Sequence, residues 1–306
     1  MQPPGVTIGT DTPPCGCGGP HVSAITPGAE NQTLGCTTCG HVQGLVNVAQ
    51  AAGGFVYAVG HLRARFPNLG AEKEYAQQTD SDPDALIRTQ EMKTTLLDET
   101  NRHLARQMQW IFTGPASEVC TVVTRESADL VNLVEALSDD DQTVHALIGH
   151  VAVYVEPSAS VQPNLPAVWV DQLFSFTVEE FVRSLPDPDR ESKVEDAEAW
   201  IRTSRQLFSW LTQRSGNRGL SDQHRAMNYL ALRYPPIYHL AFNQQHEGKA
   251  LIGVEAHLTP NGGRREVAVR FIFRHAQTHV TERYDCQVDT HDLFPFLTRS
   301  LMLSYD

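Results

Sequence analysis

Several features of secreted, membrane and nucleic-acid-binding proteins are missing from this sequence. No segment approaches about 18 uninterrupted apolar residues, the length that a membrane-spanning helix requires. The start, Met1-Gln2-Pro3-Pro4, has no basic segment followed by an apolar stretch, so it does not resemble a signal peptide. We therefore expect a cytoplasmic protein that has no membrane partner.

Basic residues are also scarce. The 24 Lys and Arg residues stand against 36 Asp and Glu residues, which gives a formal net charge of -12. This charge disfavours long-range attraction to nucleic acid and to anionic lipid, so neither is expected as a partner. With 306 residues, of which 41% are hydrophobic, the chain can bury one large core or two smaller ones as a globular protein.

The motifs of several common enzyme classes are absent. There is no Gly-x-Ser-x-Gly nucleophile elbow, no phosphate-binding Gly-x-x-x-x-Gly-Lys-Ser/Thr loop, no Gly-x-Gly-x-x-Gly after a strand and no His-Glu-x-x-His. Cys120 and Cys286 both lie in strand-like alternating patterns, where a buried and unreactive thiol is the ordinary occupant. The sequence therefore assigns no catalytic residue.

The other four cysteines are the most specific chemistry in the chain. They form two short pairs in glycine-rich surroundings, Cys15-Gly-Cys17 and Cys36-Thr-Thr-Cys39. This spacing predicts one tetrahedral zinc site with four thiolate ligands, closed to substrate and therefore structural. Disulfides or a redox pair are the alternatives, and His21 or His41 is a substitute ligand for a thiolate.

The expected fold class is α+β, with an antiparallel sheet and clustered helices preceded by a loop-built zinc-binding arm. Residues 1–53 are rich in Gly, Pro, Thr and Asn and form this arm, and residues 54–306 form the main domain. Periodicity predicts strands over 54–62, 118–124, 143–155, 168–176, 250–258, 265–274 and 278–288. It predicts helices over 71–78, 82–111, 128–137, 191–214 and 221–233, with another beginning at Thr177; the end of the 82–111 helix, around Trp110, is alternatively already strand.

One carboxylate stands out in an apolar strand pattern. If the strand alternates, Asp171 shares a face with Trp169 and Leu173, which predicts a buried carboxylate that needs a cation. The partners considered are Arg65, Arg225 and Arg233. Two roles stay open for Asp171, a structural ion pair and a peptide-anchoring or acid–base role.

Three arginines mark a polar sheet face near the carboxyl end. In the strand from 265 to 274, Arg270 and Arg274 alternate with apolar residues, and Arg283 has the corresponding place in the next strand. Such a face is either simply solvated or holds an extended acidic peptide. The predicted peptide-binding residues are Arg270, Arg274, Arg283 and Asp171.

Several segments together resemble one family. They are residues 61–77 (HLRARFPNLGAEKEYAQ), 101–107 (NRHLARQ), 170–176 (VDQLFSF), 222–235 (DQHRAMNYLALRYP) and 294–297 (FPFL). From about residue 55 onward the chain is similar to the C-terminal domain of unknown function of cyanobactin maturation proteases of the PatA and PatG type. The cysteine pairs correspond to a zinc-binding lead-in of such domains.

The resemblance implies a place in the biosynthesis of a ribosomally synthesised, post-translationally modified peptide. The resemblance also implies a domain without established catalytic residues, which is best regarded as a peptide-handling module. No subtilisin-like protease precedes it here, so we expect a free-standing homologue of the kind that a crocagin-like pathway would contain.

Three functions follow as hypotheses. The first is a non-catalytic protein that binds the precursor peptide, with structural Zn²⁺ as its cofactor. The second is an enzyme of the same pathway that cyclises or hydrolyses a peptide through acid–base groups such as Asp171 or His224. The third is a subunit that assembles another enzyme. The expected partners are the precursor peptide, other pathway enzymes and a second copy of the chain as a homodimer.

Overall fold

The structure is a computed structural model of the 306-residue chain. It describes residues 21–23, 31–36, 42–47, 54–79, 89–152, 160–162, 164–186, 194–213, 216–261 and 264–305. Helices and mainly antiparallel strands occur in separate groups, so the α+β class is confirmed. No described helix has the length and apolar character needed to cross a bilayer.

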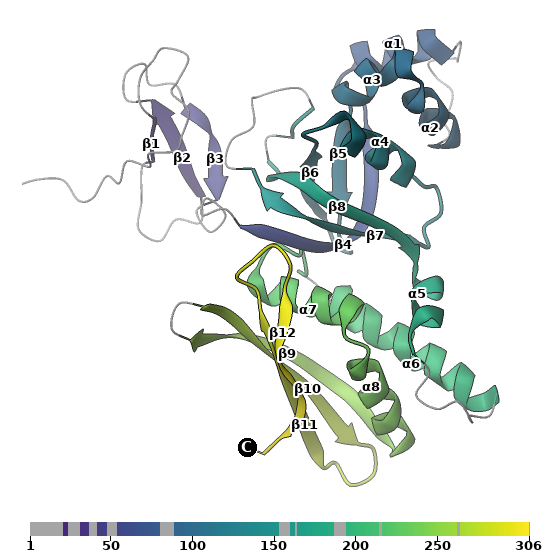
Figure 1. The fold of residues 1–306 in the computed structure, drawn as a ribbon, viewed down its shortest axis with the longest axis vertical. Helices are drawn as coiled ribbons and strands as arrows, with labels where there is room; N and C mark the ends of the chain where they lie inside the picture. The colour runs from purple at the N-terminus through teal and green to yellow at the C-terminus, as the bar shows by residue number, and fades with distance from the viewer. Residues whose placement is uncertain are drawn as a thin grey trace, which may run out of the picture.

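Five strands close into a barrel in the first half of the main domain (Figure 1). They run in the order β4-β5-β6-β8-β7, and their bounds are β4 Phe55–Arg65, β5 Gln109–Thr113, β6 Glu118–Val123, β7 Thr143–Val151 and β8 Ala167–Thr177. Only the β6–β8 pair is parallel among the described barrel strands. Helix α4, Ser127–Ala136, connects β6 to β7, the third and fourth barrel strands along the chain. This strand order and this helix position are the topology of an OB-fold barrel.

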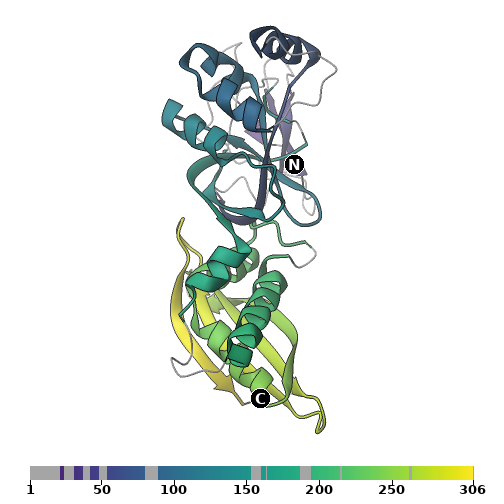
Figure 2. The same ribbon diagram turned by 90° about the vertical axis from the view of Figure 1, so that its right-hand side faces the viewer.

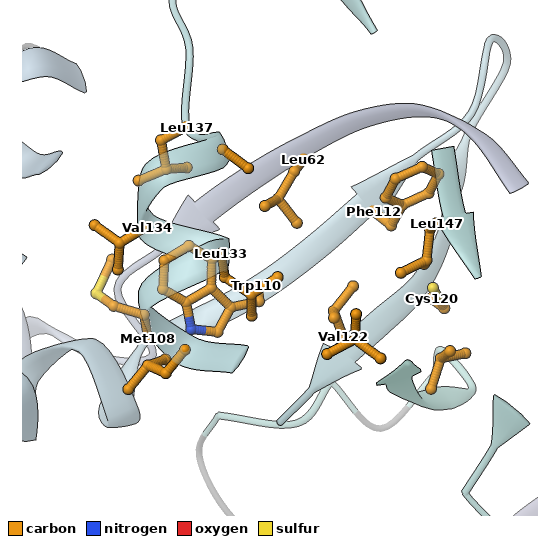
Figure 3. Packing of buried hydrophobic residues seen from close by; sticks show 14 of the residues in the cluster. Leu62, Met108, Trp110, Phe112, Cys120, Val122, Leu133, Val134, Leu137 and Leu147 are labelled. Atoms are coloured by element: carbon orange, nitrogen blue, oxygen red, sulfur yellow. The ribbon is translucent and has the colours of Figure 1, made fainter. Parts of the chain in front are cut away.

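Alternating apolar residues fill the barrel, and α4 closes one end of it. Figure 3 shows Trp110 and Leu133 next to each other beside this helix, with Val134 on the side of Met108, and all four belong to one buried cluster. The Trp110 indole nitrogen donates to the Ala105 carbonyl at 3.1 Å, so the one polar atom of the ring is satisfied inside the core. The strand contributions to this core include Leu62, Phe112, Cys120, Val122 and Leu147.

A helical insertion joins β4 to β5. It consists of α1 Leu69–Thr79, α2 Thr89–Leu97, the short 3-10 helix η1 Glu99–Asn101 and α3 Arg102–Gln107. The single helix expected over 82–111 is therefore wrong in its described part, and Trp110 lies in a strand. The Asp98 carboxylate accepts from the Thr100 amide at 2.8 Å and starts a new turn there. The sequence spacing resembled one helix because α2, α3 and the residue after α3 all bury apolar side chains in the same core. These side chains are Leu96, Leu104 and Met108.

The second half of the main domain is a four-stranded antiparallel sheet with helices on one face (Figures 1 and 2). The strand order is β12-β11-β10-β9, with bounds β9 Lys249–Asn261, β10 Arg264–His275, β11 Thr281–Asp289 and β12 Phe296–Ser304. Its helices are α5 Val178–Ser184, α6 Val194–Thr212, α7 Asp222–Arg233 and α8 Pro236–His246. Val267, Val269, Phe271 and Phe273 are buried in the core that the sheet shares with these helices, as the alternation predicted. The sequence did not predict α8 or β12.

Helix α7 joins the two halves by contacting β4. The Asn228 side chain donates to the Tyr57 carbonyl at 2.8 Å, and the Tyr57 amide donates to the Gly219 carbonyl at 3.0 Å. Gly219 has a φ of +68°, and a Cβ there would lie 2.4 Å from Ala58 Cα. Only glycine permits both this backbone conformation and this close approach.

Three short strands precede the barrel. They are β1 His21–Ser23, β2 Asn31–Cys36 and β3 Val42–Asn47, and they pair in an antiparallel sheet. The expectation of an arm built from loops is therefore wrong for these residues. Cys15, Cys17 and Cys39 lie outside the described residues. Cys36 is the last residue of β2 and pairs with His21 of β1. Because three of the four cysteines are outside the described residues, the zinc site stays a prediction.

Candidate functional site: the barrel-end cavity

A cavity of about 370 Å³ opens at the end of the barrel where β5 begins and β6 ends. We call it the barrel-end cavity; it is lined by Arg106, Met108, Trp110, residues 122–127, Leu130, Ser160 and Val161. Its volume is within the range of small-ligand pockets, roughly 300–1,000 Å³. Its walls combine buried apolar side chains from the core with polar groups near the opening. A ligand with both an apolar and a charged part matches this lining.

Two arginines line the barrel-end cavity, and each is held by an uncharged acceptor. Arg106 Nη2 donates to Ser127 Oγ at 3.0 Å. Arg125 donates to Nε2 of His150, and its guanidinium lies 5.4 Å from the centre of the Trp169 ring. Among the described residues, no carboxylate forms an ion pair with either guanidinium. Two positive charges therefore face one cavity in a chain whose net charge is -12.

A hydrogen-bonded chain behind Arg125 fixes its position. His150 Nδ1 lies 2.7 Å from Asp171 Oδ2. A guanidinium has only donors, so His150 Nε2 must accept from Arg125, and Nδ1 must then carry the proton donated to Asp171. The Nε2 lone pair, which a general base would need, is already occupied.

Asp171 is where the sequence interpretation of β8 was wrong. Its carboxylate is not buried against an arginine but is about one-quarter exposed and paired with His150. The register of β7 and β8 explains this result, because Ile148 pairs with Gln172 while Gly149 pairs with Val170. Asp171 is therefore the extra residue of a β-bulge, which turns a side chain out of the regular alternation.

The three arginines considered as partners of Asp171 have other neighbours. Arg65 pairs with Glu118 at 2.6 Å. Arg233 lies over the Phe174 ring at 5.9 Å. Arg225 is buried and donates to the carbonyls of Thr290, Asp292 and Leu293, which form the loop after β11. Burial lowers the pKa of Arg225 to about 10, but the group keeps its proton at neutral pH.

Acidic groups near the barrel-end cavity are Glu126, which lines it, and Asp129, one turn into α4. Asp129 Oδ2 accepts from the Glu126 amide at 3.1 Å, within a reciprocal capping arrangement at the start of the helix. These carboxylates stabilise the helix end. Side chains of the protein already accept hydrogen bonds from the backbone amides at the start of α4. An anion in the cavity would therefore be attracted by the two arginines and not by the helix end.

The arginines of the predicted sheet face are arranged differently. The Arg270 guanidinium donates to both oxygens of Asp285 across the strand pair, at 2.8 and 2.9 Å. This contact lowers the pKa of Asp285. Arg274 is exposed at the far end of β10 and Arg283 is half-buried on β11. The structure does not bring Asp171 to this face, since β8 belongs to the barrel.

A second cavity of about 180 Å³ lies between α6, α8 and the start of β9. Its lining includes Trp210 and Lys249. The Lys249 ammonium donates to Glu247 and Glu282, at 2.7 Å in each case. The hydrogen bond to Lys249 is the main cause of a lowered pKa at Glu282. This cavity is smaller, and its lysine is already paired with carboxylates.

The remaining candidates for catalysis are enclosed. His224, at the start of α7, is half-buried, and its pKa is lowered by desolvation and by the charge of Arg218. Cys120 and Cys286 are free buried thiols, as expected; burial raises the pKa of Cys286 to about 12 and raises that of Cys120 further. Neither thiol has the lowered pKa that nucleophilic catalysis requires. Among the described residues, no His, Cys, Asp and Glu side chains are grouped as the ligands of a metal ion.

Comparison with known proteins matches the two halves of the main domain separately. Residues 55–148 match the family described as PatG Domain, and residues 194–303 match the family described as PatG C-terminal. The matches to both segments support a PatG-type C-terminal domain. A solved structure titled "PatG Domain of Unknown Function" is similar with a TM-score of 0.63 at 14% sequence identity, covering 82% of this chain and 98% of that one. At this identity the likeness shows the fold alone. Comparison with curated proteins found no match.

The sequence interpretation missed Arg106, Arg125 and His150. They lie far apart in the chain, on α3, between β6 and α4, and on β7. The family resemblance covered Arg106 within the segment 101–107 but gave it no role. No local pattern marks the other two, because they come together only when β8 pairs with β6 on one side and with β7 on the other.

Proposed function

We propose that this protein is a non-catalytic peptide-binding component of a cyanobactin-type pathway, which makes ribosomally synthesised and post-translationally modified peptides. Similarity to the PatG-type domains supports the pathway. The observation that supports binding is the barrel-end cavity, where Arg106 and Arg125 meet apolar walls without a carboxylate partner among the described residues. The partners are the precursor peptide and the other enzymes of the pathway.

The structure also weighs against the alternative, an enzyme that cyclises or hydrolyses the peptide. Asp171 and His150 form a pair of the kind found in acid–base sites, but Arg125 occupies the imidazole nitrogen that would remove a proton. His224 is half-buried at the junction of the two halves, outside the lining of the barrel-end cavity. Binding without reaction is the function that this geometry supports best.

Calorimetry tests the proposal directly. The purified chain is titrated with the synthetic precursor peptide identified from neighbouring genes, and the same mixture is analysed by mass spectrometry. We expect micromolar or tighter affinity, about -8 kcal/mol of binding free energy, and no change in peptide mass. A mass shift that disappears in Asp171→Asn or His224→Ala would establish the enzyme instead.

The polar face of the second sheet is a separate candidate surface for the same peptide. Its exposed member, Arg274, tests it, because Arg270 is already bound to Asp285. If the precursor lies on this sheet, Arg274→Gln should weaken the calorimetric affinity about tenfold. If the barrel-end cavity is the site, this variant should bind as the unaltered protein does.

A structural zinc ion held by Cys15, Cys17, Cys36 and Cys39 is part of the proposal. The donor set suits Zn²⁺, since four thiolates complete a tetrahedral shell. Elemental analysis should return about one zinc per chain, which Cys36→Ser should reduce and Cys120→Ser should leave unchanged. A metal-free preparation with unaltered thermal stability would contradict a structural role.

A further inference from the structure

We infer that the barrel-end cavity is a carboxylate-binding subsite, in which Arg106 and Arg125 bind an anionic group of the peptide while its apolar neighbour enters between Met108, Trp110 and Leu130. The inference deepens the proposed function and rests on it for the identity of the ligand as a peptide. The group is either the C-terminal carboxylate or an Asp or Glu side chain, which share this chemistry.

The two arginines of the barrel-end cavity differ from several other arginines in having no carboxylate partner among the described residues. Elsewhere in the described part of the chain, arginines such as Arg65, Arg183 and Arg270 each bind a carboxylate. The two arginines of the barrel-end cavity bind Ser127 Oγ and His150 Nε2, both uncharged acceptors. Each guanidinium has five N–H donors in a planar fork, so donors remain for a carboxylate.

Contacts within the protein hold Arg125 before any ligand binds. Asp171 orients His150, His150 accepts from Arg125, and the guanidinium lies over the Trp169 ring. A long side chain normally loses rotamer freedom on binding, and a preset position reduces that loss. His150 and Asp171 are thus positioning residues that act through Arg125.

The place of the cavity in the barrel also favours a ligand site. Ligands of OB-fold barrels bind on the face of the second and third strands, beside the connections that follow the first and the fourth strand. Here these strands are β5 and β6, and the barrel-end cavity lies at their ends beside Arg106, in the first of these connections, and Ser160, in the second. This is an analogy between folds and does not identify the ligand. A net charge of -12 disfavours the oligonucleotides that many such barrels bind.

The test uses the four tryptophans of the full chain, Trp110, Trp169, Trp200 and Trp210. The protein is labelled with 5-fluorotryptophan, and each ¹⁹F resonance is assigned with a Trp→Phe variant. The probes are the peptide acetyl-Gly-Ala-Ile-Phe with a free carboxyl terminus, the same peptide as its amide, and the amide carrying an internal Asp. An oligothymidylate of eight nucleotides is the fourth probe.

The expected result is a saturable shift of the Trp110 and Trp169 resonances with a carboxylate-bearing peptide and none at Trp200 or Trp210. The neutral amide should bind at least about tenfold more weakly, since it cannot form charge-assisted hydrogen bonds. Comparison of the two carboxylate peptides shows whether the terminal or the side-chain group binds. Equal shifts with the neutral amide, or a stronger response to the oligonucleotide, would overturn the inference.

Matched variants locate the charge. Arg106→Gln with Arg125→Gln should abolish the shift, whereas Arg63→Gln with Arg202→Gln removes the same charge from exposed positions outside the cavity and should leave it intact. Unchanged Trp200 and Trp210 resonances report that a variant is folded. If the first pair does not fold, Arg106→Lys and Arg125→Lys keep the charge but lose the fork, and each should bind several-fold more weakly. Unaltered binding in the lysine variants would contradict the inference.

The positioning role of His150 has its own test. His150→Leu removes the acceptor of Arg125 and should weaken carboxylate binding. His150→Gln offers an amide oxygen to Arg125 and should restore most of the affinity, which a general loss of packing would not predict. Equal affinities of the Leu and Gln variants would remove His150 from the inference.

Calorimetry with the full precursor separates this inference from the proposed function. If the precursor binds the Arg106→Gln, Arg125→Gln protein with unchanged affinity, the subsite is wrong and the function stands. If the precursor does not bind the unaltered protein although the short carboxylate peptides do, the function is wrong and the subsite stands.

Discussion

Arg270 in the second half of the main domain and the two arginines of the barrel-end cavity lie in opposite settings. In the second sheet, Arg270 lies opposite Asp285 on adjacent strands and forms two hydrogen bonds with its carboxylate. In the barrel, Arg106 and Arg125 meet across a cavity and bind only uncharged acceptors. Arg270 has its counter-ion on the neighbouring strand, whereas the two arginines at the end of the barrel remain available for a ligand.

The largest effect is expected at the junction between the two halves, where a third kind of arginine occurs. Arg225 is a buried arginine with a structural role, since it connects α7 to three carbonyls after β11 and lies 5.3 Å from the Phe55 ring of β4. Arg225→Met should lower the free energy of unfolding by about 3 kcal/mol or more, because these buried carbonyls lose their donors. Chemical denaturation measures the effect.

The matched control for this variant is Arg233→Met on the same helix, where the side chain is exposed. It should change the free energy of unfolding by less than about 1 kcal/mol. A similar small change for Arg225→Met would show that the junction does not depend on its guanidinium.

A smaller effect on stability is expected where the paired Arg270 is compared with the two arginines of the barrel-end cavity. A double-mutant cycle with Arg270→Gln and Asp285→Asn should give a coupling of about 1 kcal/mol, as for a half-buried bidentate pair. Arg106→Gln and Arg125→Gln should each change stability by less than about 0.5 kcal/mol, because neither loses a carboxylate partner. Urea denaturation of the six proteins of this set, including the double variant and the unaltered chain, gives both numbers. A large stability loss from the cavity variants would mean that these arginines serve the fold.

The smallest effect expected is on pH dependence. His145 is buried in the barrel, where Nε2 donates to the Ala136 carbonyl at 2.8 Å, and desolvation lowers its pKa. The unfolded chain then binds the proton at a higher pH than the folded chain, so stability is full above the ordinary pKa of about 6.5 and falls as pH drops below it. His224, whose pKa is also lowered by burial, acts in the same direction.

Thermal unfolding at pH 7.5 and 5.5 measures this dependence. The midpoint should be lower at pH 5.5, and the difference should shrink in His145→Gln, which cannot take up the proton. A pH difference that is unchanged in this variant would assign the effect to His224 or to carboxylates.

Much of the second half could be predicted from local patterns. Alternation along 265–274 and 278–288 identified both strands and the buried row of Val267, Val269, Phe271 and Phe273, because an exposed and a buried face leave a period of two in the sequence. α8 was missed because the prolines before it suggested a stop, although Pro236 begins a new helix. β12 was missed because it is an edge strand whose outward residues show no clean alternation.

The residues that revealed the family are largely structural. In the segment 222–235, hydrogen bonds from Arg225 and Asn228 hold α7 against its neighbours. The Tyr234 hydroxyl accepts a hydrogen bond from the Leu301 amide at 3.1 Å. The same segment carries the predicted acid–base candidate His224, which the structure encloses. A family pattern of this kind records the packing of a fold and gives little information on its ligand.

The sequence was sufficient for the α+β class, for three of the four strands of the second sheet, for the two buried thiols and for the family resemblance, since each of these leaves a local signal in periodicity or motif. Tertiary structure decided the rest. A bulge moved Asp171 out of the alternation and toward His150, and the pairing of β8 with both β6 and β7 brought His150 near Arg125. A charge finds its partner through strand order and register, and these depend on contacts between residues far apart in the chain.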